Sequence, residues 1–61
     1  MDVDELKMRV SKEVADIMLE ISRLYNSQGK IELATLAQKL AAKHLQRYAA
    51  YTNRLRARAV G

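Results

Sequence analysis

The sequence predicts an all-α protein, an antiparallel two-helix hairpin with helices at about residues 3–26 and 30–58. Apolar residues recur every three or four positions on both sides of one interruption, which is the period of an amphipathic helix. The 61 residues contain no proline, and only one of the two glycines is internal. The interruption, Asn26-Ser27-Gln28-Gly29, is made of residues that cap helices and form turns. Because so short a turn forces two long helices to run antiparallel, residues 1–61 form a single helical-hairpin unit.

The first helix is defined by a stripe of large aliphatic residues that advances 21 positions in six steps, about 3.5 per step. The stripe consists of Val3, Leu6, Val10, Val14, Ile17, Ile21 and Leu24. Ser11 is a residue type that caps helices, but the stripe keeps its phase across this position. We therefore expect one continuous helix, with this stripe packed against the second helix. The acidic residues Glu13, Asp16 and Glu20 fall on a face that we expect to be solvated.

The second helix is predicted by a stripe that advances 22 positions in six steps, about 3.67 per step, which is close to the period of an unstrained helix. The stripe consists of Leu33, Ala37, Leu40, His44, Tyr48, Tyr51 and Leu55. Many Ala, Leu, Lys, Arg and Gln residues, all good helix formers, support helix throughout 30–58.

Further apolar residues outside the two stripes predict a partner, because each of two helices shields only one side of the other. These residues are Met8, Ala15, Leu19, Ile31, Ala34, Ala41, Ala42, Leu45 and Ala49. Small side chains among them let another helix approach closely. We expect either a homodimer that completes a four-helix bundle or docking onto another helical protein. The alternative is that the alanines serve helix propensity alone.

Charge is divided unevenly between the two halves of the chain. Residues 1–29 carry a net charge of −2, and residues 30–61 carry +6. Five cations spaced mostly four residues apart lie on one side of the second helix: Lys39, Lys43, Arg47, Arg54 and Arg58. A ridge of this kind suits a phosphate backbone, so we expect a nucleic-acid partner. RNA is our hypothesis, and the sequence leaves open whether DNA would serve instead. For the terminal arginines the alternative is pairing with the acids of the N-terminus, since the two ends of a hairpin meet.

The sequence offers no parts for catalysis. His44 is the only histidine, cysteine is absent, and there is no glycine-rich phosphate loop. We therefore expect no catalytic residue, metal site, cofactor or small-molecule substrate, and the protein is not predicted to be an enzyme. No apolar run approaches the ~20 residues of a membrane span, so we expect a soluble, cytoplasmic protein without membrane contact. Tyr48 and Tyr51 are predicted to pack in the core rather than to stack on bases.

A resemblance to a known family covers about residues 13–50. The residues that carry it are Ile17-Met18-Leu19-Glu20-Ile21 before the turn and Glu32-Leu33-Ala34, Lys39-Leu40-Ala41 and Arg47-Tyr48 after it. This pattern resembles the helical N-terminal segment of the archaeal and eukaryotic ribonuclease P protein component 4, the Rpr type. The four-cysteine zinc ribbon of that family is absent here. The resemblance implies a non-catalytic subunit that helps a catalytic RNA process pre-tRNA and binds a partner protein through its helices.

Three functional hypotheses follow. The first is an RNA-binding accessory subunit of a ribonucleoprotein. In it the five cations contact phosphates, and the alanine-rich apolar residues of the second helix outside its stripe pack against another helix. The second is a protein–protein adaptor or a homodimeric four-helix-bundle module that binds no nucleic acid. The third is an isolated helical repeat or a designed bundle without a ligand.

Overall fold

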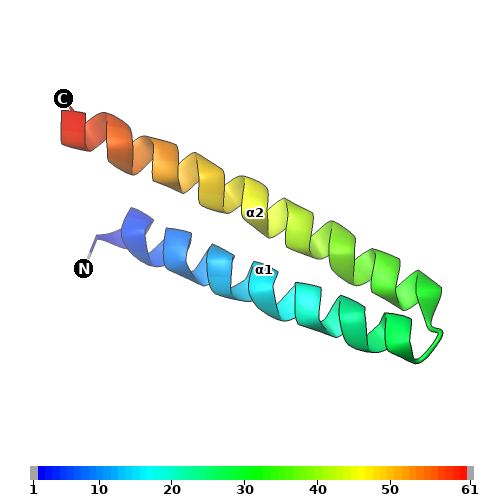
Figure 1. Ribbon diagram of the computed structural model, residues 1–61. Coiled ribbons are helices and arrows are strands. Elements are labelled where there is room, and N and C mark those ends of the chain that lie inside the picture. The colour runs from blue at the N-terminus through cyan, green and yellow to red at the C-terminus, as the bar shows by residue number, and fades with distance from the viewer. Residues whose placement is uncertain (1, 61) are drawn as a thin grey trace.

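The chain folds into two antiparallel helices joined by one tight turn. The computed structural model describes residues 2–60, in which α1 spans Val3–Ser27 and α2 spans Ile31–Val60. The helices lie side by side along their length, with both ends of the chain at one end of the hairpin and the turn at the other (Figure 1). The hairpin measures 49 × 17 × 11 Å between Cα atoms, so it is a thin slab. The predicted all-α hairpin is confirmed, and α2 is uninterrupted.

The helix ends are set by local hydrogen bonds. At the start of α1 the carboxylate of Asp2 accepts a hydrogen bond of 2.8 Å from the backbone N–H of Asp4, as a helix N-cap does. At its end, the N–H of Lys30 donates to the carbonyl of Tyr25 at 2.9 Å, and the N–H of Gly29 donates to that of Asn26 at 3.0 Å. Two such bonds form a Schellman motif, whose left-handed residue is Gly29 with φ of 76°. Glycine is needed there because a Cβ atom disfavours this conformation.

The contact between α1 and α2 is built from small side chains. The buried residues are Ser11, Ala15, Ser22, Ala34, Ala37 and Ala41, and no large side chain is fully buried within residues 2–60. Alanine and serine let two helix backbones come closer than leucine would allow. The hydroxyl of Ser22 donates a hydrogen bond of 3.0 Å to the backbone carbonyl of Ala34, so its burial is compensated.

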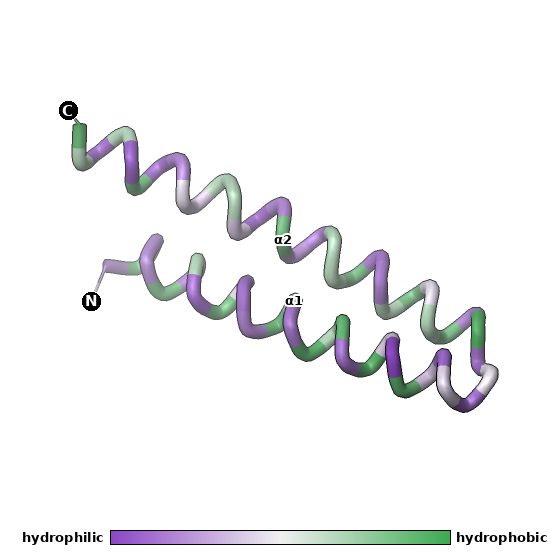
Figure 2. The backbone as a smooth tube through the Cα atoms, viewed as in Figure 1, coloured by the Kyte–Doolittle hydropathy of each residue, from purple (hydrophilic) through white to green (hydrophobic). Residues whose placement is uncertain are grey.

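The prediction that the aliphatic stripe of α1 packs against α2 is wrong for most of the stripe. Val14 and Ile21 are half-buried, but the other five members are exposed. Val3 is 63% exposed, Ile17 51% and Leu24 61%. Ser11, Ala15 and Ser22 make the contact with α2 instead. They lie about a third of a turn away from the aliphatic stripe around the same helix. The physical reason is that α1 has two adjoining apolar faces, and the face with small side chains allows the closer helix approach. Figure 2 shows hydrophobic positions on the outer side of α1 as well as between the helices.

On α2 the predicted stripe is partly correct. Ala37 is buried, and His44, Tyr48, Tyr51 and Leu55 are half-buried. Leu33 and Leu40, however, are 45% and 40% exposed, because Ala34 and Ala41 take their places in the contact with α1. The helix is therefore rotated so that alanine rather than leucine meets α1.

The residues that we assigned to a partner interface divide into three groups. Ala15, Ala34 and Ala41 are buried within the hairpin, so this part of the prediction is wrong. These small residues form the contact between α1 and α2 of the same chain. Met8 and Leu19 are half-buried at the edges of that contact. The remaining four stay exposed, and they are Ile31, Ala42, Leu45 and Ala49.

An ion-pair cluster joins the open end of the hairpin. The guanidinium of Arg58 lies 2.9 Å from a carboxylate oxygen of Asp2 and 3.5 Å from one of Asp4. The hydrogen bond from Arg58, followed by that from the backbone N–H of Asp4, lowers the pKa of Asp2, and the same contact raises the pKa of Arg58. The predicted pairing of terminal arginines with N-terminal acids is therefore confirmed for Arg58. Glu5 instead pairs with Arg9 at 2.9 Å.

Replacement of Ala15 by leucine tests the close contact. Ala15 is fully buried against α2, so Ala15→Leu is expected to force the helices apart and cost about 1–3 kcal/mol of unfolding free energy. Urea unfolding followed by circular dichroism measures this change. The control is Ala42→Leu at an exposed position of α2, which is expected to leave stability nearly unchanged. Equal effects of the two substitutions would contradict the small-residue contact.

The open-end cluster predicts a pH effect. Because the pKa of Asp2 is lower in the folded chain than its ordinary value of 3.8, its contribution to stability is present above pH 3.8 and is lost as pH falls further. Asp2→Asn keeps an N-cap side chain but removes the charge. We expect the variant to have a lower melting temperature than the parent at pH 6 and the same melting temperature near pH 2. A difference that persists at pH 2 would show that the ion pair is not its cause.

Candidate interaction surface

The main exposed feature of the hairpin is a set of large aliphatic side chains, which we call the aliphatic face. Each of its members is 40–63% exposed. The members are Val3, Leu6, Val10, Ile17 and Leu24 of α1 and Leu33, Leu36 and Leu40 of α2. Side chains of this kind gain about 25 cal/mol for each Å² of apolar area removed from water. The face therefore favours contact with another apolar surface.

The two rows of the aliphatic face lie on the same side of the hairpin. Leu6 and Val10 of α1 line one groove together with Arg47 and Tyr51 of α2. Arg47 follows Leu40 by seven residues, or two helical turns, so both point to that side. On α1 the members recur at seven-residue intervals from Val3 through Val10 and Ile17 to Leu24, which keeps them in one row.

The hairpin has more surface than a compact monomer of its mass. Its accessible surface is 4676 Å². A folded monomeric protein of 6.9 kDa is expected to expose roughly 4,000 Å² by the usual scaling. The excess follows from the slab shape, in which neither broad side is covered by a third helix. Burial within one chain is thus incomplete.

The five predicted nucleic-acid contacts are brought to one side of α2, but they do not all remain free. Arg58 is held by Asp2 and Asp4. The guanidinium of Arg54 lies 5.5 Å from the ring centre of Tyr51, in cation–π range. Within residues 2–60 no carboxylate lies within 4 Å of a charged nitrogen of the other three, which are Lys39, Lys43 and Arg47. These exposed cations border the leucine row of the aliphatic face.

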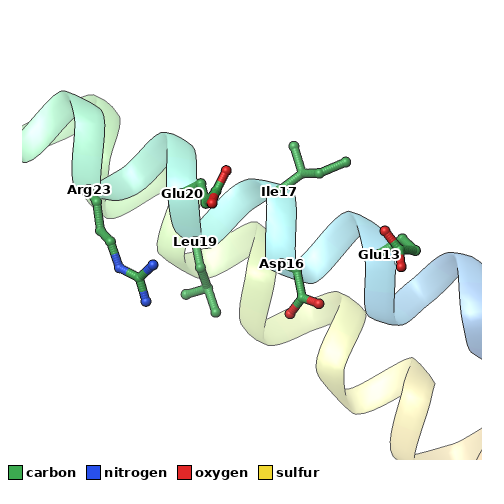
Figure 3. Close-up of a pocket in the computed structure, with 6 residues that line it drawn as sticks. All are labelled: Glu13, Asp16, Ile17, Leu19, Glu20 and Arg23. Carbon is green, nitrogen blue, oxygen red and sulfur yellow. The ribbon is translucent and has the colours of Figure 1, made fainter.

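Two acidic residues of α1 border the aliphatic face in the same way, a feature that the sequence analysis missed. Figure 3 shows Glu13 and Glu20 on the same side of α1 as Ile17, with Asp16 on the opposite side. Asp16 is paired with Lys12 at 3.0 Å, whereas Glu13 and Glu20 have no cationic partner within residues 2–60. Their spacing of three or four residues from Ile17 was the available signal. This spacing indicates a border of the aliphatic face only once Ile17 is known to be exposed.

Other kinds of site have little support in the part of the chain that the structure describes. Residues 2–60 contain no group of three His, Cys, Asp or Glu side chains placed to hold a metal ion. Neither α1 nor α2 combines the length and apolarity that a membrane crossing requires. The chain matches no protein-family model, no curated protein and no solved structure.

Proposed function

We propose that this protein is a helical assembly module that pairs with a second copy of itself through the aliphatic face to form a four-helix bundle. The observation that supports this most directly is the distribution of apolar side chains. Eight large aliphatic residues are 40–63% exposed on one side, while the buried residues among residues 2–60 are all alanine or serine. A hairpin that is stable as a monomer would be expected to bury its largest apolar side chains in its own core.

The size of the face fits a stable dimer. The broad side of the slab measures 49 by 17 Å. The outline of this side covers roughly 800 Å² between Cα atoms, which is of the same order as the accessible surface that each partner buries in a protein interface of standard size. An identical chain presents the same apolar side, and most soluble oligomers are symmetric assemblies of identical chains. A second copy therefore supplies a surface of matching length and chemistry.

Polar substitutions on the face test the proposal. In the variant Ile17→Gln/Leu36→Gln, four aliphatic side chains of a dimer become polar, so the dissociation constant is expected to rise about 100-fold or more. Sedimentation equilibrium over micromolar concentrations measures it.

The matched control carries the same chemical change on the other side of the hairpin. Leu45 lies nine residues from Leu36, half a turn away in angle, and Ile31 lies near Leu45 on that side. The variant Ile31→Gln/Leu45→Gln is expected to dimerise as the parent does. A parent chain that stays monomeric and folded at all concentrations would refute the proposal.

RNA binding within a ribonucleoprotein is a second candidate function. It is supported by Lys39, Lys43 and Arg47, which lie on one side of α2 without carboxylate partners in residues 2–60. In this proposal the protein is a non-catalytic accessory subunit, and its resemblance to ribonuclease P protein component 4 points to tRNA processing. Arg54 adds a fourth cation, while Arg58 is occupied by Asp2 and Asp4.

Salt dependence tests this second function. Four phosphate contacts predict that log Kd for a pre-tRNA changes with log salt concentration with a slope of about 3 to 3.5. Replacement of Lys39 and Lys43 by glutamine is expected to reduce the slope by about 1.5, because two of the contacts are lost. Filter binding between 50 and 300 mM KCl measures both. A slope near zero, or no loss in the variant, would exclude the RNA function.

A further inference from the structure

We infer that the two copies pair with their turns at the same end, so that Glu13 and Glu20 of each copy form ion pairs with Lys43 and Lys39 of the other. This inference rests on the proposed self-association and specifies its geometry. It assigns a partner to two acidic and two basic residues that have no ion-pair partner within residues 2–60 of their own chain.

Two arrangements let two hairpins meet through the same face with two-fold symmetry. If the symmetry axis runs along the helices, both turns lie at one end and α1 of one copy packs along α2 of the other. If the axis runs across the helices, the turns lie at opposite ends, α1 packs along α1 and α2 along α2. The charges that border the face differ between the two arrangements.

Within one chain, residues at the same level have numbers that add up to between 56 and 60. Ser22 contacts Ala34, Lys7 lies over the ring of Tyr51, and Arg58 pairs with Asp2. A two-fold axis along the helices does not change levels, so the same relation holds between the copies. It places Ile17 beside Leu40 of the other copy and Leu24 beside Leu33, which are apolar pairs.

The same relation places the acids and the lysines level with one another. Glu13 comes level with Lys43 of the other copy, and Glu20 with Lys39. The lysines and the acids also lie on edges of the two helices that meet in this arrangement. Lys43 lies three residues after Leu40, on the flank opposite the buried Ala37, so it borders the outer edge of α2.

On α1, Glu13 and Glu20 lie on the flank of Ile17 that is turned away from the buried Ala15 (Figure 3). Because the symmetry axis exchanges the two helices, the outer edge of α1 meets the outer edge of α2 in the other copy. Opposite charges thus face each other along the two outer seams of the bundle, where the outer edge of α1 in one copy meets the outer edge of α2 in the other.

The opposite arrangement brings like charges together. Lys43 and Arg47 lie on either side of the midpoint of α2, and Glu13 lies close to the midpoint of α1. When the turns are at opposite ends, these midpoints meet their own copies, so Lys43 approaches Lys43 and Arg47, and Glu13 approaches Glu13. The whole helices show the same bias, since residues 31–60 carry a net charge of +5 and residues 3–27 carry −1. Packing α2 on α1 avoids that repulsion.

Charge reversal tests the seams. The variant Lys39→Glu/Lys43→Glu is expected to weaken the dimer about tenfold or more, because four attractive pairs become repulsive. It also lowers the net charge from +4 to zero, and general charge repulsion alone would therefore make it dimerise more tightly. Addition of Glu13→Lys and Glu20→Lys to the same chain is expected to restore the parent dissociation constant, because every pair is attractive again with its signs exchanged.

The matched control is Arg23→Glu/Arg56→Glu, which makes the same change in net charge at exposed residues away from the seams. It is expected not to weaken the dimer. Tighter dimerisation of Lys39→Glu/Lys43→Glu, or failure of the fourfold variant to recover, would overturn the inference. If Lys39→Glu/Lys43→Glu loses RNA binding at an unchanged dimer affinity, these lysines serve nucleic acid instead, and the inference fails as well.

A distance measurement separates this inference from the proposed function. The chain has no cysteine, so Gln28→Cys in the turn accepts a single nitroxide label. With both turns at one end, the two labels are expected within roughly 20–30 Å, about two helix diameters plus the label arms. With turns at opposite ends, they would lie near the full 49 Å length of the hairpin. A dimer with the long distance overturns only the inference, whereas a monomer at every concentration overturns the proposed function too.

Discussion

The close approach of two helix backbones through alanine and serine is the constraint on which the rest of this hairpin depends. Ala15 meets α2 with no exposed surface, and Ser22 closes a hydrogen bond to the backbone of Ala34 across the contact. No large side chain is fully buried in this contact within residues 2–60. The large aliphatic side chains are thereby displaced onto the broad side of the slab, where a single chain has nothing to cover them.

This displacement explains what the sequence predicts well and what it does not. Helix number, helix ends and the turn follow from local rules, such as the Schellman motif that Gly29 makes possible. The direction of each apolar face is not local. Periodicity shows that α1 has apolar residues on successive turns, but the stripe that contains Ile17 and the stripe that contains Ala15 differ by only part of a turn. A hydrophobic pattern read from the sequence favours the stripe of large residues. The stripe that is buried is the one whose small side chains allow the two helix backbones to approach closely.

The charged residues show a similar dependence on orientation. From spacing alone, Lys39 and Lys43 form part of a basic ridge, and Glu13 and Glu20 belong to a solvated surface. Once Ile17 and Leu40 are known to be exposed, the same four residues become the borders of one apolar face. Their chemistry is unchanged, but a border of complementary charges suits a protein surface, while an isolated ridge suits a phosphate backbone.

The narrow seam also has a consequence for how the protein is maintained in a cell. The fully buried side chains of residues 2–60 are all small, so in the proposed dimer much of the burial of large aliphatic side chains would come on association. Folding and association would be linked by mass action in that dimer, so the folded fraction would rise with the amount of protein present. Newly made chains at low abundance would remain open to proteases, and synthesis above the dissociation constant would protect them. The lifetime of a chain that assembles as proposed would thus depend on how often two copies meet.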